Sequence, residues 1–196
     1  MPAAFAPIYL ASCSPRRREL LAQLAIPFEP LSIDIPEHQQ PGEGPGDYVL
    51  RLAAAKARAG LVVIHAQPLP ARPVLGADTA VVIDGQILGK PVGRSDGLAM
   101  LRRLSGSEHQ VYSGIALATE SDTGTALSVS RVQFSTLSEH AIQDYWDTGE
   151  GSDKAGCYAV QGRAAEFIQR IDGSYSGIMG LPLFETANLL GRAAKC

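Results

Sequence analysis

The chain of 196 residues has a mass of 20.7 kDa, long enough to bury a substantial core, and its 45% hydrophobic and 19% charged residues indicate a globular protein. Its net charge of −3 argues against a nucleic-acid coat or an anionic-membrane binder, because both depend on a large basic excess. No apolar run approaches the roughly 20 residues that span a bilayer, and no basic segment leads into an apolar one at the N-terminus, so we expect a cytoplasmic protein without membrane or nucleic-acid partners.

Cysteine is sparse and odd in number, with Cys13, Cys157 and Cys196 at spacings that form no CxxC motif. This usage is typical of free thiols in a reducing compartment. The four histidines show no metal-ligand spacing, so we interpret them as surface or hydrogen-bonded polar residues.

The first elements are a short apolar strand over residues 8–11 and a helix that begins at about Ser14. Pro15 suits the first helical position and Ser14 the cap before it. An apolar stripe follows on this helix, formed by Leu20, Leu21 and Leu24.

Three arginines, Arg16, Arg17 and Arg18, occupy the first turn of this helix, where the macrodipole makes positive charge unfavourable by about 0.3–1 kcal/mol per exposed residue. An anion bound at the helix end would turn this penalty into attraction, so the pattern predicts a phosphate pocket at a strand–loop–helix corner. The alternative is an ordinary solvated basic helix start.

A second strand is expected over residues 28–33, followed by a loop rich in Pro, Gly and Glu that ends at Gly46. The next helix starts near Asp47 and carries Lys56 beside an apolar stripe. The stripe consists of Tyr48, Leu52, Ala55 and Ala59. A proline-rich break over residues 67–73 ends this part of the chain.

The middle of the chain predicts a buried strand over residues 74–83, a turn at Asp84–Gly85 and a short return strand at 87–88. Ser95 is expected to cap the next helix, whose inward residues are Leu98, Leu101 and Leu104.

The last third predicts two long strands, over residues 111–119 and 126–135, that pair antiparallel around a Ser-Asp-Thr-Gly turn. Ser138 caps a helix that buries Ala141, Ile142, Tyr145 and Trp146, residues 156–171 form strand and loop, and Pro182 starts a closing helix. This order predicts an α/β fold: a mixed twisted sheet with flanking helices, as one domain over residues 1–196 with two lobes around a central cleft.

Asp78 lies inside the apolar strand at 74–83, where a carboxylate without partners would cost several kcal/mol. It needs a cation, a metal ion or a set of donors; otherwise it is an Asp at a strand bend that bonds nearby amides. Thr79 points to the opposite face of a regular strand. Glu37, in the loop after the second strand, would join Asp78 to supply the two carboxylates that Mg²⁺ commonly takes from protein.

Arginine supplies 13 of the 17 basic residues, yet Lys56, Lys90 and Lys154 lie in the segments singled out here. A lysine ammonium acts on a phosphate as a compact point charge, whereas the planar guanidinium groups of Arg16 and Arg17 are expected to bind it through two parallel hydrogen bonds.

Eight segments together resemble, in order, the Maf family of nucleoside triphosphate pyrophosphatases. They are residues 11–21, 48–57, 76–79, 88–91, 104–106 with His109, 153–156, 158–162 and 180–182.

The resemblance implies a fold like that of inosine triphosphate pyrophosphatase and hydrolysis of a nucleoside triphosphate between its α and β phosphates, with a divalent cation (Mg²⁺ or Mn²⁺). It implies that Asp78 is the catalytic acidic residue and that Glu37 and Asp78 hold the metal. The implied substrate pocket comprises Ser12, Ser14, Arg16, Arg17, Lys56, Lys90 and Lys154. Arg16, Thr79 and Gln161 match the trio of the branch that acts on dTTP and UTP. A homodimer is also implied.

Several points stay open at this stage. Asp78 serves as a base or as a metal ligand, and Gln161 suits the imide edge of uracil or thymine without excluding cytosine. The alternatives to the proposed activity are a nucleotide-binding regulator of cell division and a purine pyrophosphatase for ITP, XTP or 7-methyl-GTP. Ser113 and residues 174–177 depart from the family pattern, which leaves the base preference less certain than the reaction.

Overall fold

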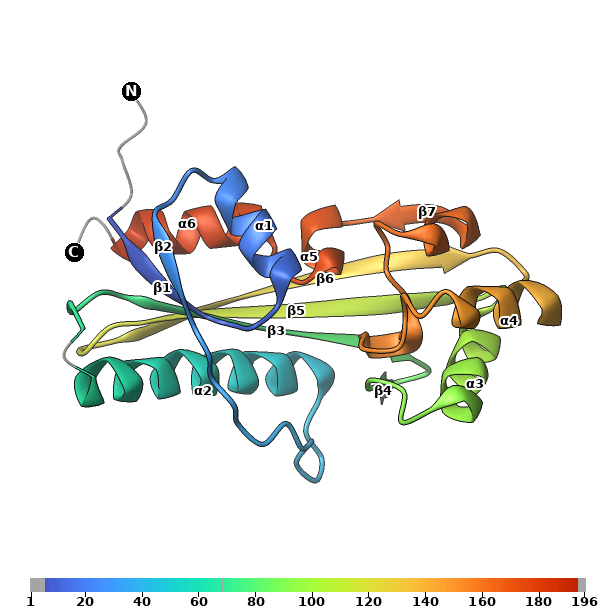
Figure 1. The fold of residues 1–196 in the computed structure, drawn as a ribbon, viewed down its shortest axis with the longest axis horizontal. Coiled ribbons are helices and arrows are strands. Elements are labelled where there is room, and N and C mark those ends of the chain that lie inside the picture. Colours follow the sequence, from blue (N-terminus) through green and yellow to red (C-terminus); the bar gives the residue numbers. More distant parts are fainter. Residues whose placement is uncertain (1–5, 68, 194–196) are drawn as a thin grey trace. The chain divides into compact units, whose positions relative to one another are not determined.

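The structure is a computed structural model that describes residues 6–67 and 69–193. Cys196 and part of the expected proline-rich break lie outside the described residues. Seven strands form one sheet, in the order β2-β1-β3-β5-β6-β7 with β4 paired to β3 (Figure 1). The strands are β1 (Ile8–Ala11), β2 (Phe28–Leu31), β3 (Val74–Ile83), β4 (Gln86–Leu88), β5 (Glu108–Ala118), β6 (Thr123–Phe134) and β7 (Ile168–Asp172).

Six α-helices and two 3₁₀-helices accompany the sheet within the described part of the chain. They are α1 (Pro15–Gln23), α2 (Pro45–Ala66), α3 (Arg94–Leu104), α4 (Glu139–Asp147), η1 (Ala155–Cys157), η2 (Arg163–Phe167), α5 (Tyr175–Met179) and α6 (Leu183–Ala193). No helix in residues 6–67 and 69–193 combines the length and the apolar content that crossing a bilayer demands. The sheet is mixed, because β1 pairs in parallel with β2 and β3 whereas β3–β4 and β6–β7 are antiparallel. The predicted mixed α/β fold is confirmed.

The chain divides into two compact units, which we call the first and the second unit. The first comprises Met1–Asp78, Ser113–Ser128 and Gly180–Cys196, and the second comprises Thr79–Tyr112 and Val129–Met179. These units correspond to the two expected lobes. The single domain over residues 1–196 and its cleft stay predictions.

In the first unit, α2 lies along one side of the strands and α1 and α6 lie on the other (Figure 1). Two glycines permit the close approach of α2. A Cβ on Gly76 of β3 would lie 2.2 Å from the Ala53 carbonyl oxygen and 2.8 Å from the Ala57 nitrogen, and one on Gly114 of β5 would lie 2.7 Å from the Val49 backbone. The helix backbone therefore rests directly on two neighbouring strands, at positions where only glycine fits.

The Gly76→Ala variant should lower the free energy of unfolding by about 2–4 kcal/mol, because backbone atoms that cannot yield locally block the added methyl group. Urea titration measures this loss. Gly191→Ala is the matched control, since among the described residues nothing beyond its chain neighbours and its own helix backbone lies within 4 Å of the added Cβ, and alanine is the better helix former. An equally stable Gly76→Ala protein would contradict the close contact between α2 and β3.

The core of the second unit surrounds a buried histidine. His109 on β5 is 1% exposed, bonds the Tyr158 hydroxyl through Nε2 at 2.8 Å, and packs edge-on against Phe134 with ring centroids 5.0 Å apart. Burial lowers the pKa of His109 to about 4. The ring is therefore neutral in the folded protein at neutral pH.

Acid should destabilise the fold through His109. Between pH 6.5 and about 4 the unfolded chain binds a proton that the folded chain does not, so stability present above pH 6.5 is lost as the pH falls through this window. A shift of this size corresponds to about 3 kcal/mol. Urea titrations from pH 7 to pH 4 should show this loss in the parent and a smaller loss in His109→Gln, whose amide does not titrate. Parallel pH profiles for the two proteins would contradict the assignment.

The ends of several elements differ from the expectation for local reasons. Helix α3 begins at Arg94 after Gly93, and the prediction that Ser95 caps it is wrong: the Asp96 carboxylate accepts the Val92 N–H at 3.0 Å. The β5–β6 turn falls at residues 119–122, because the Thr119 hydroxyl accepts the Asp122 N–H at 3.1 Å. A connection this short joins antiparallel neighbours, as predicted. Ser138 caps α4 as predicted, accepting the Ala141 N–H at 3.2 Å.

Candidate active site

Asp78, in the middle of β3, is a buried carboxylate with a dedicated partner. Its exposed fraction is 6%, and the Lys56 ammonium lies 2.7 Å from its Oδ1. Burial raises the pKa of Asp78, while the positive charges of Lys56 and Arg17 oppose that rise. The prediction that a cation compensates this carboxylate is confirmed, and the alternative of a strand bend bonded to amides does not describe it.

Lys56 reaches both acidic residues of the predicted pair. Its Nζ lies 2.6 Å from Glu37 Oε1 as well as 2.7 Å from Asp78, and the residue is only 8% exposed. The sequence placed Lys56 beside the apolar stripe of its helix, and this is wrong: Lys56 lies on the buried face itself. That face consists of Val49, Leu52, Ala53, Lys56, Ala57, Gly60 and Ile64. The close contact of Ala53 and Ala57 with Gly76 brings Lys56 within reach of Asp78, two residues further along the same face of β3.

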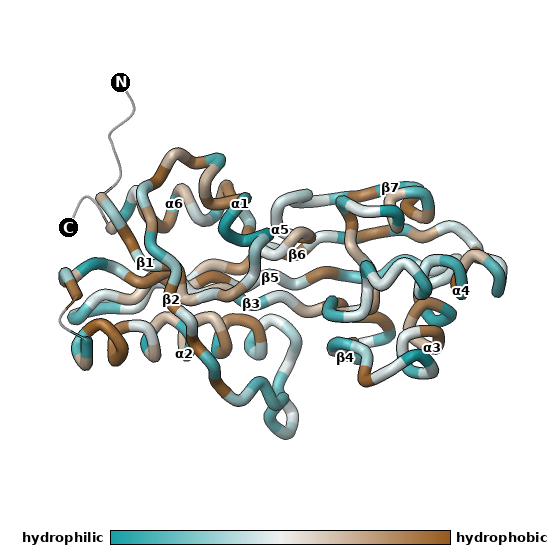
Figure 2. The backbone as a smooth tube through the Cα atoms, viewed as in Figure 1, coloured by the Kyte–Doolittle hydropathy of each residue, from teal (hydrophilic) through white to brown (hydrophobic). Residues whose placement is uncertain are grey.

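Glu37 reaches Lys56 from the loop between β2 and α2, which is largely hydrophilic in Figure 2. Its side chain is 43% exposed. The Tyr48 hydroxyl donates to the Glu37 carbonyl oxygen at 3.0 Å, and Arg51 donates to the His38 carbonyl oxygen at 3.0 Å. Arg51 also binds Glu43 at 2.5 Å and holds the pKa of that carboxyl at about 2. Side chains from the first turns of α2 thus fix the loop that carries Glu37.

Tyr48 is a site residue whose role sequence reasoning missed, because it was interpreted only as part of an apolar stripe. Its pKa is raised to about 12 by burial, with the negative charges of Asp78 and Glu37 adding to the rise. The signal was present in the spacing: Tyr48 and Lys56 lie eight residues apart, so they share one face of the helix.

Arg17 brings positive charge to the acidic pair from the start of α1. Its Nε donates to the Gly180 carbonyl oxygen at 2.8 Å and its guanidinium to the Ser12 hydroxyl at 3.4 Å. Burial lowers the pKa of Arg17, and the charges of Asp78 and Glu37 raise it in part. The role of Gly180 as a carbonyl acceptor has no signature in the side chains and could not be predicted.

The helix start agrees with the prediction in position but not in its cap. Helix α1 begins at Pro15, yet the Ser14 hydroxyl makes no capping hydrogen bond, so that expectation is wrong. The Ser12 hydroxyl instead accepts the N–H of Ser14 itself at 3.2 Å, which holds the turn just before the helix. Arg16 is half-buried and Arg18 is exposed.

The two carboxylates converge on one cation, the Lys56 ammonium. Because Glu37 and Asp78 both contact one nitrogen, at 2.6 and 2.7 Å, their contacting oxygens lie at most about 5.3 Å apart. Mg²⁺ takes one or two carboxylates at about 2.1 Å and keeps water or phosphate oxygens elsewhere, so two hard oxygen donors fit it. Within the described residues no group of three His, Cys, Asp or Glu residues could hold a metal ion.

The remaining predicted residues belong to the second unit. Thr79 follows Asp78 and is half-buried, Lys90 is exposed after β4, and Gln161 is exposed before η2. Lys154 is paired with Asp153 before η1. The Gly156 N–H donates to the Gly89 carbonyl oxygen at 3.1 Å, which joins the loops that carry Lys154 and Lys90.

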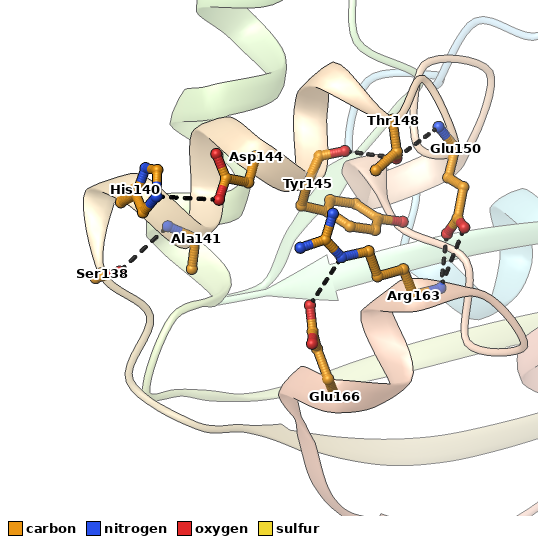
Figure 3. A network of polar contacts seen from close by, with 9 residues as sticks. All are labelled: Ser138, His140, Ala141, Asp144, Tyr145, Thr148, Glu150, Arg163 and Glu166. Atoms are coloured by element: carbon orange, nitrogen blue, oxygen red, sulfur yellow. Dashed lines mark hydrogen bonds and ion pairs between the residues drawn. The ribbon is translucent and has the colours of Figure 1, made fainter.

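The backbone on both sides of Gln161 is held by side chains of the α4 region, and Figure 3 shows one of these contacts, between Glu150 and Arg163. The Tyr145 hydroxyl accepts the buried Ala159 N–H at 3.1 Å, and the Glu150 carboxylate accepts the Arg163 N–H at 2.9 Å. A Cβ on Gly162 would lie 2.2 Å from the Glu150 carboxylate, so a larger residue there would displace that carboxylate. The backbone on either side of Gln161 is thus held in place, a feature that no local sequence pattern predicts.

Comparisons with known proteins match nearly the whole chain. The family described as Maf-like protein matches residues 7–193. A dTTP/UTP pyrophosphatase of Burkholderia pseudomallei is 54% identical over 195 residues, covering 95% of this chain and 93% of that protein. Proteins of the same name from Bordetella avium and Cupriavidus pinatubonensis are 50% and 51% identical, each covering 95% of this chain and 94% and 96% of their own lengths.

A solved structure, that of the Staphylococcus aureus Ham1 protein, is similar with a TM-score of 0.42 and 12% identity over 66% of this chain and 72% of that one, a likeness too weak to carry an inference. The family match and the relatives of about 50% identity, by contrast, extend over the strand, loop and helix segments that supply the acidic pair and its cations. The chain therefore belongs to the Maf-like protein family.

Proposed function

We propose that this chain is a nucleoside triphosphate pyrophosphatase that hydrolyses dTTP and UTP, with CTP as a further substrate, between the α and β phosphates. The products are the nucleoside monophosphate and pyrophosphate, which suits a role in maintaining the nucleotide pool. The observation that carries the proposal is the cluster in which the buried Lys56 binds the buried Asp78 and the half-exposed Glu37 beside Arg17, in a chain 54% identical to a named dTTP/UTP pyrophosphatase.

In this proposal the first unit supplies the machinery for the anhydride. Asp78, whose pKa burial raises, orients the attacking water and accepts its proton, because a base is more effective as its pKa approaches the working pH. Arg17 stabilises the charge that develops on the leaving pyrophosphate, and its bond to the Gly180 carbonyl holds the guanidinium in place beforehand. Ser12, Ser14 and Arg16 complete the phosphate contacts at the start of α1.

A divalent cation, Mg²⁺ or Mn²⁺, is proposed as cofactor, with Glu37 and Asp78 as the residues that hold it. When bound it supplies charge neutralisation for the phosphates and a water of lowered pKa. The donor set supports this assignment, because two converging carboxylates match what Mg²⁺ takes from proteins.

The second unit is proposed to supply Lys90 and Lys154 for the phosphates and Thr79 and Gln161, with Arg16, for the choice of base. The backbone bond between the loops of the two lysines supports the first assignment. The anchored backbone on either side of Gln161 supports the second, because a side-chain amide presented from a held turn can reject a base that leaves it unpaired. The cytoplasm is the proposed compartment and a homodimer the proposed assembly.

A screen for pyrophosphate release tests the proposal. The purified chain is incubated with dTTP, UTP, CTP, GTP, ITP and 7-methyl-GTP, each with and without Mg²⁺. We expect release that requires the cation and is fastest with dTTP and UTP. Fastest release with ITP or 7-methyl-GTP would identify a purine pyrophosphatase instead, and tight nucleotide binding without turnover would identify a regulator.

A further inference from the structure

Lys56 occupies the position in the acidic pair that a metal ion would need. Its ammonium lies 2.6 and 2.7 Å from the two carboxylates, one of them on the buried Asp78. A cation with ligand distances of about 2.1 Å reaches oxygens up to about 4.2 Å apart, so it would bind the same two oxygens after a small movement of the half-exposed Glu37. Two cations between the same two oxygens would repel each other, so the metal ion is expected to displace the ammonium.

The charges of the cluster already balance without a metal. Lys56 and Arg17 carry two positive charges against the two negative charges of Glu37 and Asp78, and Arg16 adds a further positive charge beside Arg17. A divalent cation that entered alone would leave a large positive excess in a largely buried site. A triphosphate carries enough negative charge to cancel it.

A displaced Lys56 also needs a new partner, because it is only 8% exposed and an unpaired buried ammonium is costly. Phosphate oxygens are such a partner. The acidic pair alone offers none once its oxygens bind the metal.

We propose that Lys56 is a resident counter-ion of the acidic pair that gives way to the divalent cation only when triphosphate oxygens are there to receive its ammonium. The chain then binds free divalent cation weakly and takes it up together with the nucleotide. This inference rests on the proposed function for the identity of the nucleotide, but the behaviour of Lys56 toward a metal is a separate property of the chain.

Calorimetric titration with MnCl₂ tests the inference on three proteins: the parent, Lys56→Met, and Arg58→Met as the matched control. Arg58 lies on the same helix, is exposed, and bonds Thr123 rather than the acidic pair. We expect Lys56→Met to bind Mn²⁺ at least about tenfold more tightly than the parent, and Arg58→Met to bind it like the parent. A lysine that merely supported the structure would give the opposite result, weaker Mn²⁺ binding on its removal. Equal or weaker binding by a folded Lys56→Met would overturn the inference.

A second measurement needs no variant and decides the matter if Lys56→Met does not fold. The parent is titrated with MnCl₂ in the presence of a dTTP analogue whose α–β bridging oxygen is replaced by carbon, which cannot be hydrolysed at that position. Mn²⁺ should bind at least about tenfold more tightly than without the analogue, and equal affinity would overturn the inference. The Mn²⁺ titrations without nucleotide test the role of Lys56 even if the screen detects no pyrophosphate release. If the screen detects release but Lys56→Met binds Mn²⁺ like the parent, the inference about Lys56 is overturned and the proposed function is not.

Discussion

The Asp78→Asn variant should release pyrophosphate at least about a hundredfold more slowly than the parent protein with dTTP and Mg²⁺. An asparagine amide retains the size of the side chain but neither accepts a proton nor binds a cation as a carboxylate does. Initial rates at saturating nucleotide measure the loss. Asp84→Asn is the matched control, because Asp84 is an exposed carboxylate at the turn after the same strand and its positive φ of 52° is one that asparagine adopts readily.

The same substitution should not destabilise the fold, and this separates a catalytic role from a structural one. The pKa of Asp78 is raised in the folded protein, so folding favours the neutral carboxyl. The stability that this neutral form contributes is fully present below the pKa of about 3.9 in the unfolded chain. It is lost as the pH rises through the pKa of Asp78 in the folded protein. The neutral amide avoids that loss at pH 7, and Lys56 keeps Glu37 as a partner. A folded Asp78→Asn protein that released pyrophosphate at the parent rate would remove Asp78 from the reaction.

The chemistry of single side chains indicated part of this cluster. An Asp inside an apolar strand needs a partner, and Lys56 is that partner. The basic first turn of α1 predicted a phosphate pocket, which stays a prediction; in the structure the charge of Arg17 acts on the acidic pair. The order of strands and helices was also readable, because apolar periodicity and turn residues mark each element locally.

The parts that could not be predicted depend on backbone contacts between distant segments. The register of α2 against β3 is set by the contact of Gly76 with Ala53 and Ala57, and it is this contact that turns Lys56 inward rather than to the edge of its helix. The capping roles expected of Ser14 and Ser95 were wrong for a different reason. Helix α3 already begins before Ser95, directly after Gly93, and near both helix starts side chains bond other N–H groups: Ser12 accepts from Ser14 and Asp96 from Val92. A local pattern identifies a residue able to cap a helix but not the bond that it makes.

The Lys56→Met variant should lose about 3 kcal/mol of unfolding free energy at pH 7, because it removes the ammonium in direct contact with the buried Asp78 and leaves that carboxylate next to Glu37. The loss should shrink as the pH falls toward 4, since the pKa of Asp78, already raised by burial, rises further without the ammonium and the carboxyl becomes neutral. Urea titrations at pH 7 and pH 4.5 measure both effects, with Arg58→Met as the exposed control on the same helix.

The double variant Lys56→Met/Asp78→Asn should recover most of this stability, because the neutral amide no longer needs a counter-ion. The cost of Lys56→Met should thus be smaller by about 2 kcal/mol or more in the Asp78→Asn background, which is the coupling expected of a buried pair in direct contact. Equal costs in the two backgrounds would mean that Lys56 stabilises the protein through its packing on α2 and not through its charge. A large coupling would show that the fold itself depends on a cation at the acidic pair, so that the ammonium can leave only when another positive charge replaces it.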